Sequence, residues 1–330
     1  MNWSLAHIWN GSAFTVHKYV QSSGLWSGGG EPVLQVGQAF VIAPSTNSTW
    51  IQNYFDGNGI VPTLTEQQIT SSNFIFSITG STNSTWGVYS SMDLTNWTLS
   101  GDVTLNLYGS AFCTNNAISG VPYCFYKLTD GVCYSATIGF VRVTANPGYT
   151  AIADQLIAPD STLNGLFPNG KSPDGMALPD QTQIQFWNGS AYATNIWSQS
   201  LGEWLPNGSA TLSPGVGVFI LNPTTNSFGA TFVGQVSEGQ SVLPLSTGNR
   251  AFISSMVPKS GGLQTALGYM PNNQDAVFIW NGSSLVEHKY VQSSGTWSGT
   301  GGEPVIQVGE GIFIEPSTNN EWIEYYFDND

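Results

Sequence analysis

Few side chains in this sequence could do acid–base chemistry, and most of them occur in duplicate. The histidines are His7, His17 and His288, and the last two each precede Lys-Tyr-Val. Glu31 and Glu303 each precede a proline. A catalytic base is needed once, in one geometry, so a residue that recurs in two copies of a motif is better explained by packing. Paired carboxylates could flank a sugar, but nothing in the sequence brings these two together. We therefore predict no catalytic residue.

Oxygen-rich segments that could hold a calcium ion follow the same Tyr-Phe pair at two places. Asp56 and Asn58 follow the first pair, and Asp328 and Asp330 follow the second. Calcium takes carboxylate and carbonyl oxygens, but neither segment has the twelve-residue loop with a closing glutamate. Asp, Asn and Gly also favour plain turns. Calcium at these four residues is thus one hypothesis and a plain turn the other; no other cofactor is predicted.

Two tryptophans lie in matching loops that could bind a sugar. Trp26 and Trp297 each occupy the pattern Ser-Gly-x-Trp-Ser-Gly. An exposed ring in such a loop can stack on the face of a sugar, since aromatic side chains suit half-wet positions. The alternative is that each ring folds back and covers the sheet. Trp26 and Trp297 are the candidate glycan-binding residues.

The cysteines are confined to one short stretch, at Cys113, Cys124 and Cys133. No histidine is close to them in the sequence, so a zinc site lacks its usual ligands. If the protein is exported, one disulfide and one free thiol are expected. Cys113 and Cys124 lie on segments that we interpret as neighbouring strands, which favours a bond between them; three buried thiols are the alternative.

The charge of the chain excludes several classes of partner. The net charge is −14, the pI is about 4.2, and only 8% of residues are charged, against roughly 25% in an average soluble domain. Nucleic acid requires a cationic partner, and so does an anionic membrane surface. No run of 18 apolar residues occurs, and the first residues do not form a signal peptide. We predict neither nucleic-acid binding nor membrane insertion.

Internal repetition is the strongest signal in the sequence. Residues 9–56 and 280–328 are nearly identical apart from one insertion, and a divergent third copy begins at Trp187. The two C-terminal copies are preceded by apolar segments, 149–156 and 250–257, which we expect to be first strands. The N-terminal copy has no such segment and is therefore a half repeat. Its sheet is expected to have an unpaired edge. Three explanations are open: sequence upstream of this chain supplies the missing strand, a neighbouring subunit donates one, or residues 1–8 fill part of the gap.

The local patterns predict strands throughout. Alternating apolar and polar residues are separated by Asn-Gly turns, and no sustained helical period occurs. Residues 74–143 contain turn signals every 8–12 positions, as in a β-sandwich. We predict an all-β fold of antiparallel repeat domains plus one β-sandwich-like module. The predicted boundaries are 1–58 for the half repeat, 59–72 for a linker, 73–146 for the module, and 147–240 and 241–330 for the two repeat domains.

Several motifs point to a known group of proteins. Residues 91–98 (Ser-Met-Asp-Leu-Thr-Asn-Trp-Thr), 124–128 (Cys-Phe-Tyr-Lys-Leu) and 138–142 resemble a small β-sandwich module found near the ends of large exported proteins of environmental bacteria. The Trp-Asn-Gly repeats with Pro-Gly-x-Gly-x-Phe-Ile resemble the β-repeats that often follow that module. The resemblance covers most of the chain. It implies an exported location and no catalytic residues.

These observations favour one function over a second. The first is a non-catalytic extracellular structural or adhesive protein of a cell surface, self-associating through β-strand pairing as a fibre or coat subunit. The second is an array of carbohydrate-binding modules that use the loop tryptophans to bind glycans.

Overall fold

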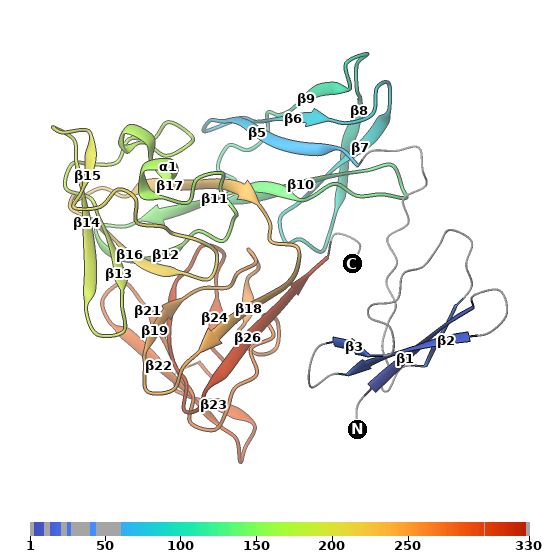
Figure 1. Ribbon diagram of the computed structural model, residues 1–330. Helices are drawn as coiled ribbons and strands as arrows, with labels where there is room; N and C mark the ends of the chain where they lie inside the picture. Colours follow the sequence, from blue (N-terminus) through green and yellow to red (C-terminus); the bar gives the residue numbers. More distant parts are fainter. Residues whose placement is uncertain are drawn as a thin grey trace. The chain divides into compact units, whose positions relative to one another are not determined.

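The computed structural model describes residues 3–9, 14–20, 25–27, 40–43, 61–299 and 301–327. These residues form antiparallel strands, and the helical elements among them are α1 (Leu163–Leu166) and the 3-10 turn η1 (Pro168–Gly170) (Figure 1). The all-β prediction is confirmed. The chain divides into two units, residues 1–54 and 55–330, which are described separately.

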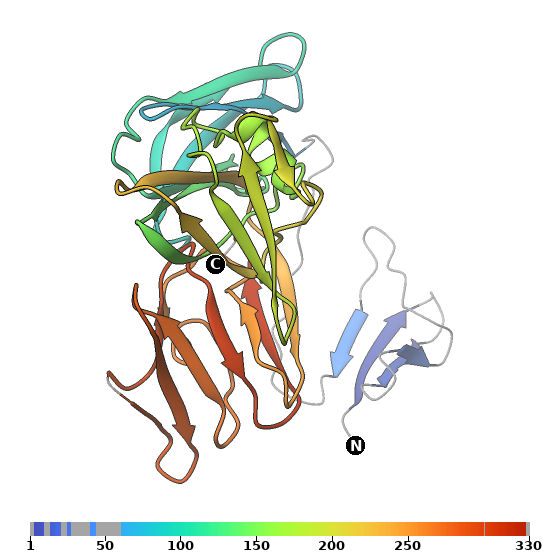
Figure 2. The same cartoon turned by 90° about the vertical axis from the view of Figure 1, so that its left-hand side faces the viewer.

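The β-sandwich module, formed mainly by residues 61–145, consists of two sheets that face each other (Figures 1 and 2). The first sheet has the order β5 (Thr63–Ile69), β6 (Phe74–Thr79), β9 (Ser110–Asn115). The second has the order β17 (Phe228–Gln235), β11 (Ile138–Ala145), β10 (Tyr123–Thr129), β7 (Thr85–Ser91), β8 (Thr98–Thr104). Alternation in β6 points Phe74, Phe76 and Ile78 into the core, where they meet Tyr126 and Phe140 from the opposite sheet. The predicted sandwich is thus present.

The predicted linker, 59–72, is wrong over its described part, because residues 63–69 form β5 and pair with β6. A β-bulge between Glu66 and Gln68 shifts the register of this strand. The extra residue lets both Leu64 and Ile69 point into the core although they are an odd number of positions apart. The bulge breaks the strict alternation by which a strand is recognised in a sequence.

Two full repeats follow the module and share one sheet topology. Repeat A has the order β12 (Gly148–Ala153), β16 (Gly217–Asn222), β13 (Gln183–Trp187), β14 (Tyr192–Ser198), β15 (Glu203–Leu205). Repeat B has the order β19 (Ala251–Ile253), β25 (Ile312–Glu315), β21 (Ala276–Trp280), β22 (Leu285–Val291), β23 (Thr296–Ser298). β12 and β19 are the predicted first strands. They pair with β16 and β25, as the repetition requires.

Each repeat also has a pair of flanking strands, and this pair changes the domain boundaries. In repeat B, β18 (Gly239–Leu245) pairs with β26 (Asn320–Tyr326). In repeat A, the corresponding pair is β11 with β17. β11 therefore belongs both to the module and to repeat A. Repeat A spans residues 138–235 and repeat B 239–326, so the predicted boundary near 146 divides a shared sheet.

The half repeat forms a four-stranded sheet in the other unit, with the order β3 (Leu25–Ser27), β2 (Phe14–Val20), β1 (Trp3–Trp9), β4 (Phe40–Ala43). Its register equals that of repeat B: Ala6 lies opposite His17, as Val277 lies opposite His288. Within the described residues, β4 pairs with β1 alone. Among the described residues of this unit no further strand pairs with β4, and the open edge beside it stays a prediction.

The Asn-Gly turns explain why the hairpins recur. Gly189 and Gly282 have φ values of +98° and +97°, which residues with a side chain rarely adopt. The Asn188 side-chain oxygen accepts hydrogen bonds from two backbone N–H groups of its own turn, and Asn281 does the same. The turn is thereby closed by local sequence alone.

Candidate interaction site

Trp297 lies on β23 and is buried against the segment that connects β19 with β21. Its side chain is 7% exposed, and its Nε1 donates a hydrogen bond to Oε1 of Gln264 at 3.1 Å. The ring is therefore covered rather than exposed, in agreement with the alternative that it folds back, and glycan binding at Trp297 stays a prediction. Trp26 occupies the same position on β3, but its side chain lies outside the described part.

Glu303 joins the loop that follows β23 to the turn at residues 263–267. Its Oε1 accepts the backbone N–H groups of Gln264 and Thr265 at 2.6 and 2.7 Å, and its Oε2 accepts the hydroxyl of Thr265 at 3.0 Å. It thereby caps the turn at 263–267 from across the repeat. In repeat A, Thr162 caps α1 itself by accepting the N–H of Gly165 at 3.1 Å. The repeated Glu-Pro pair marked this residue in the sequence, but not its role.

His288 is packed inside repeat B rather than exposed at a site. His288 is 6% exposed on β22, and its Nδ1 lies 2.7 Å from the carbonyl oxygen of Gly302. This contact ties the strand to the loop that leads to Glu303. His7 on β1 lies opposite Val16, and His17 on β2 lies opposite Ala6; both histidines are half-buried.

Repeats A and B pair through reciprocal contacts. The Trp187 Nε1 donates to the carbonyl oxygen of Arg250 at 2.7 Å, and the Trp280 Nε1 donates to that of Tyr149 at 2.9 Å. Both tryptophans begin a Trp-Asn-Gly turn, and both acceptors lie at the start of a first strand. Each repeat thus gives the other the same contact, as in a two-fold symmetric dimer.

The backbones repeat this reciprocity. The N–H of Ala153 donates to the carbonyl oxygen of Gly309 at 2.9 Å, and that of Ser254 donates to Gly215 at 3.1 Å. Ala153 ends β12, Ser254 directly follows β19 at the equivalent position, and the two glycines occupy equivalent turns. The pairing therefore rests on main-chain hydrogen bonds as well as on side chains.

Two glycines allow this close approach. A Cβ added at Gly217 would lie 2.7 Å from the carbonyl oxygen of Ile253, and one at Gly311 would lie 2.8 Å from that of Ile152. These are equivalent positions contacting equivalent carbonyl groups. Any side chain at either glycine would push the two repeats apart.

An aromatic cluster fills the rest of the A–B interface. Phe252 and Phe313 stack with ring centroids 4.1 Å apart. Trp187 meets Phe313 edge-on at 6.1 Å, and Trp280 meets Phe219 edge-on at 5.3 Å. Edge-on and stacked pairs add to the free energy gained from burial alone. The interface is thus continuous and largely apolar.

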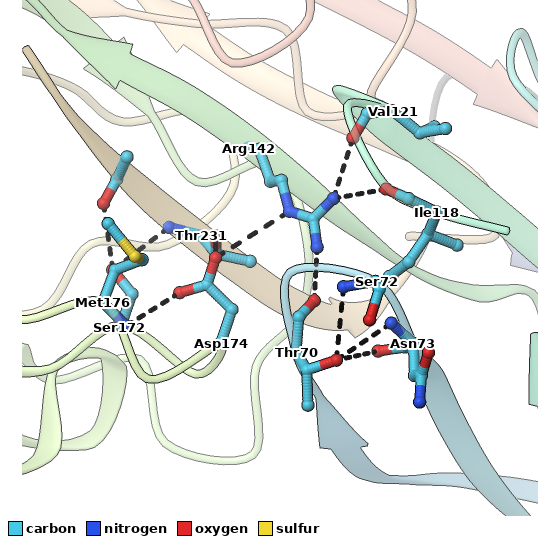
Figure 3. A network of polar contacts seen from close by, with 11 residues as sticks. Thr70, Ser72, Asn73, Ile118, Val121, Arg142, Ser172, Asp174, Met176 and Thr231 are labelled. Atoms are coloured by element: carbon cyan, nitrogen blue, oxygen red, sulfur yellow. Dashed lines mark hydrogen bonds and ion pairs between the residues drawn. The ribbon is translucent and has the colours of Figure 1, made fainter. Parts of the chain in front are cut away.

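Arg142 joins the module to repeat A (Figure 3). Its guanidinium donates to the carbonyl oxygens of Thr70 at 2.5 Å, Ile118 at 2.7 Å and Val121 at 3.1 Å, all in the module. On its other side, Nε lies 3.8 Å from a carboxylate oxygen of Asp174 in repeat A. Arg142 belongs to one of the motifs that carry the resemblance, but its partners come from segments distant in the sequence.

The cysteines do not have the expected arrangement. Cys113 lies on β9 and Cys124 on β10, which belong to opposite sheets of the sandwich rather than to neighbouring strands. All three cysteines are free thiols in the structure. Burial raises the pKa of Cys113 and Cys124. They behave as apolar residues of the module core, and the structure contains no bond between them.

The calcium hypothesis cannot be compared with the structure, since Asp56, Asn58, Asp328 and Asp330 lie outside the described residues. Elsewhere in the described ranges, no group of three or more His, Cys, Asp or Glu side chains is arranged to hold a metal ion. The same part of the chain contains no helix that is long and apolar enough to cross a membrane.

No protein-family model and no curated protein matches this chain. Among solved structures, the chain is similar to a tetra-tandem repeat in the extending region of a large adhesion protein, with 12% identity and a TM-score of 0.21, over 99% of this chain and 92% of that one. It also matches an Escherichia coli alpha-2-macroglobulin activated by porcine elastase (9%, TM-score 0.21, 84% and 33%) and a Salmonella alpha-2-macroglobulin reacted with methylamine (8%, 0.20, 99% and 25%). TM-scores this low do not establish a shared fold.

Proposed function

We propose that the protein is a non-catalytic structural or adhesive protein of the cell surface that assembles through β-strand pairing. The observation that supports this proposal is where the recurring polar and aromatic residues are engaged. Trp187, Trp280, Trp297 and Glu303 donate to or accept from other parts of the repeats rather than facing an open site. Repeated residues that connect one part of the protein to another suit a scaffold that carries mechanical load or holds other domains.

The rigid connection of the parts supports the same proposal. Repeats A and B are joined by reciprocal hydrogen bonds and an apolar interface, and Arg142 joins repeat A to the module. Contacts of this kind resist rotation between domains, whereas domains joined by small polar interfaces move freely. An exported location is what the resemblance described above implies, and the high content of Ser, Thr, Asn and Gly fits a strand-rich exterior.

Surface labelling tests this function directly. Antibodies against the chain should label intact cells of the producing organism, and deletion of the coding region should reduce attachment or remove a surface layer. Cells lacking an unrelated exported protein are the matched control. Labelling that appears only after the cells are permeabilised would contradict the proposal.

A further inference from the structure

Strand β9 lies at one edge of the three-stranded sheet of the module and carries an exposed aromatic ring. In the part of the chain that the structure describes, β9 pairs with β6 alone. Cys113 points toward the core, whereas its neighbour Phe112 is 70% exposed on the outer face of the sheet. Tyr108, in the turn before the strand, is 91% exposed. A strand edge of this kind is a template for pairing with another chain.

The main chain of β9 has hydrogen-bonding groups that β6 does not use. The N–H of Ser110 donates to the side-chain oxygen of Asn106 at 3.1 Å, and its carbonyl oxygen accepts the N–H of Asn106 at 3.0 Å. Both groups of Ser110 therefore point away from β6. Because the direction alternates along an antiparallel strand, the N–H and carbonyl groups of Phe112 and Thr114 point the same way. No strand of the described residues pairs with them.

The other edges of the sandwich are protected against such pairing. β5 and β8 each contain a bulge, which distorts an edge strand, and β8 also carries the charged Asp102. β17 is covered by the segment around Ile157, which exchanges two main-chain hydrogen bonds with Gln235. β9 has six residues in unbroken register, without charge or proline. Of the sandwich edges in the described residues, β9 alone lacks these protections.

The distribution of charge indicates which partner fits this edge. No charged residue occurs between Glu66 and Asp93 or between Asp102 and Lys127, so β6, β9 and the turns beside them are uncharged. Two copies with a net charge of −14 each repel one another over much of their surfaces. An uncharged strip is where two such copies can approach, whereas a cationic partner would prefer an acidic strip.

β9 is also complementary to a second β9. Two strands that run antiparallel about Cys113 place Phe112 opposite Thr114 of the second copy, and the two-fold axis repeats the pair. The outward N–H and carbonyl groups of these residues then face one another and exchange hydrogen bonds in both directions. On the outer face, each Phe112 ring packs beside a β-branched side chain, which is a favourable cross-strand pair. The groups that one copy leaves exposed are thus covered by the other.

We propose that β9 is a dimerisation edge, at which two copies of the chain join their three-stranded sheets into one continuous sheet. The partner is a second copy of this chain, and the contact is β9 on β9, antiparallel and centred on Cys113. This inference names the strand used in the assembly by strand pairing proposed above, and it rests on that proposal.

Sedimentation equilibrium of the full chain over a range of concentrations tests the dimer. Phe112→Lys should weaken dimerisation at least about tenfold, because it removes both rings and places like charges beside the axis. Thr114→Pro removes an N–H that β6 does not use and should also weaken it about tenfold. Leu99→Lys, the same change at a leucine of β8 that is 51% exposed, is the matched control and should leave the dimer intact.

Two results would overturn the proposal. One is a chain that stays monomeric at every concentration. The other is a dimer that Leu99→Lys weakens as much as Phe112→Lys does. Hydrogen exchange of the β6 and β10 amides shows whether each variant is folded, and Phe112 is exposed enough for its replacement to leave the core intact.

Photo-cross-linking locates the contact. Benzoylphenylalanine replaces Phe112, and a mixture of isotope-labelled and unlabelled chain distinguishes links between copies from links within one copy. We expect links between copies at residues 112–114; their absence, or links confined to other strands, would refute the β9 contact. Antibody labelling of intact cells does not depend on β9. A protein that is labelled on the cell surface but does not respond to Phe112→Lys would therefore refute this edge alone and leave the proposed location standing.

Discussion

Repeats A and B have the same strands in the same order but satisfy their buried polar groups differently. In repeat B, Trp297 Nε1 is bonded to Gln264, and Glu303 caps the adjacent turn. In repeat A, the equivalent Trp204 has a buried Nε1 with no hydrogen-bond partner. The apolar framework of a repeat thus tolerates divergence, whereas the buried polar groups of each copy have different partners.

A second difference lies at the end of the first strand. In repeat A, Asp154 is fully buried, and one of its carboxylate oxygens has no partner. In repeat B the equivalent residue is Ser255, whose hydroxyl lies 2.6 Å from the buried carboxyl of Glu324. Burial raises the pKa of both carboxyl groups, that of Glu324 to about 7. Both repeats thus bury an acid at this place: Asp154 directly after β12 in repeat A, and Glu324 on β26 in repeat B.

The largest expected effect comes from removing the ring that links the halves of repeat B. Trp297→Ala should destabilise repeat B by about 3–5 kcal/mol, the usual loss for a buried aromatic ring. Hydrogen exchange of the β19–β26 amides measures it, because a chain of several parts need not unfold in one step. Unchanged protection together with loss of glycan binding would instead support the carbohydrate-binding hypothesis.

Stability should also depend on pH through Glu324. The folded carboxyl keeps its proton up to a pKa of about 7, whereas the unfolded one loses it near 4.5. Repeat B should therefore lose stability as pH rises between these values, by roughly 3 kcal/mol in full.

Glu324→Gln should flatten this dependence, because an amide can accept from the N–H of Met256 and donate to Ser255 without ionising. The measurement is the denaturation midpoint of repeat B from pH 4 to 8. Asp154→Asn is the matched change in repeat A. An identical pH profile for wild type and Glu324→Gln would refute the role of this carboxyl.

The reciprocity of the A–B interface predicts equal effects at its two glycines. Gly217→Ala and Gly311→Ala should each cost about 1–3 kcal/mol, as for overpacking of a tight interface, because each new Cβ meets a backbone carbonyl. Thermal unfolding of the two variants measures this. Ala39→Gly in the half repeat is the control and should lack such an effect; a large cost at only one glycine would break the symmetry.

The smallest expected effect separates the two buried tryptophans. Trp297→Phe leaves Gln264 without its donor and should cost about 1–2 kcal/mol more than Trp204→Phe, which removes a buried N–H that has no partner. Denaturant unfolding with hydrogen exchange as the local readout compares the two. Equal losses would mean that the Trp297–Gln264 hydrogen bond does not distinguish the repeats.

Much of the architecture could be predicted because its signals are local. Alternation in β6 and β10, the Asn-Gly turns and the near-identity of two copies act over a few residues, so they specify strands, hairpins and the half repeat without knowledge of the fold. The open edge beside β4 is likewise predicted from the number of strands in each copy.

The tertiary structure decided which strands and side chains meet across long stretches of chain. β17 joins the sheet of the module through β11, Cys113 and Cys124 fall on opposite sheets, and repeats A and B pair reciprocally. A tryptophan in a Gly-Ser loop has the same local sequence whether it is exposed or covered. For Trp297 the cover is Gln264, a residue of the other half, and only the packing of the two halves brings them together.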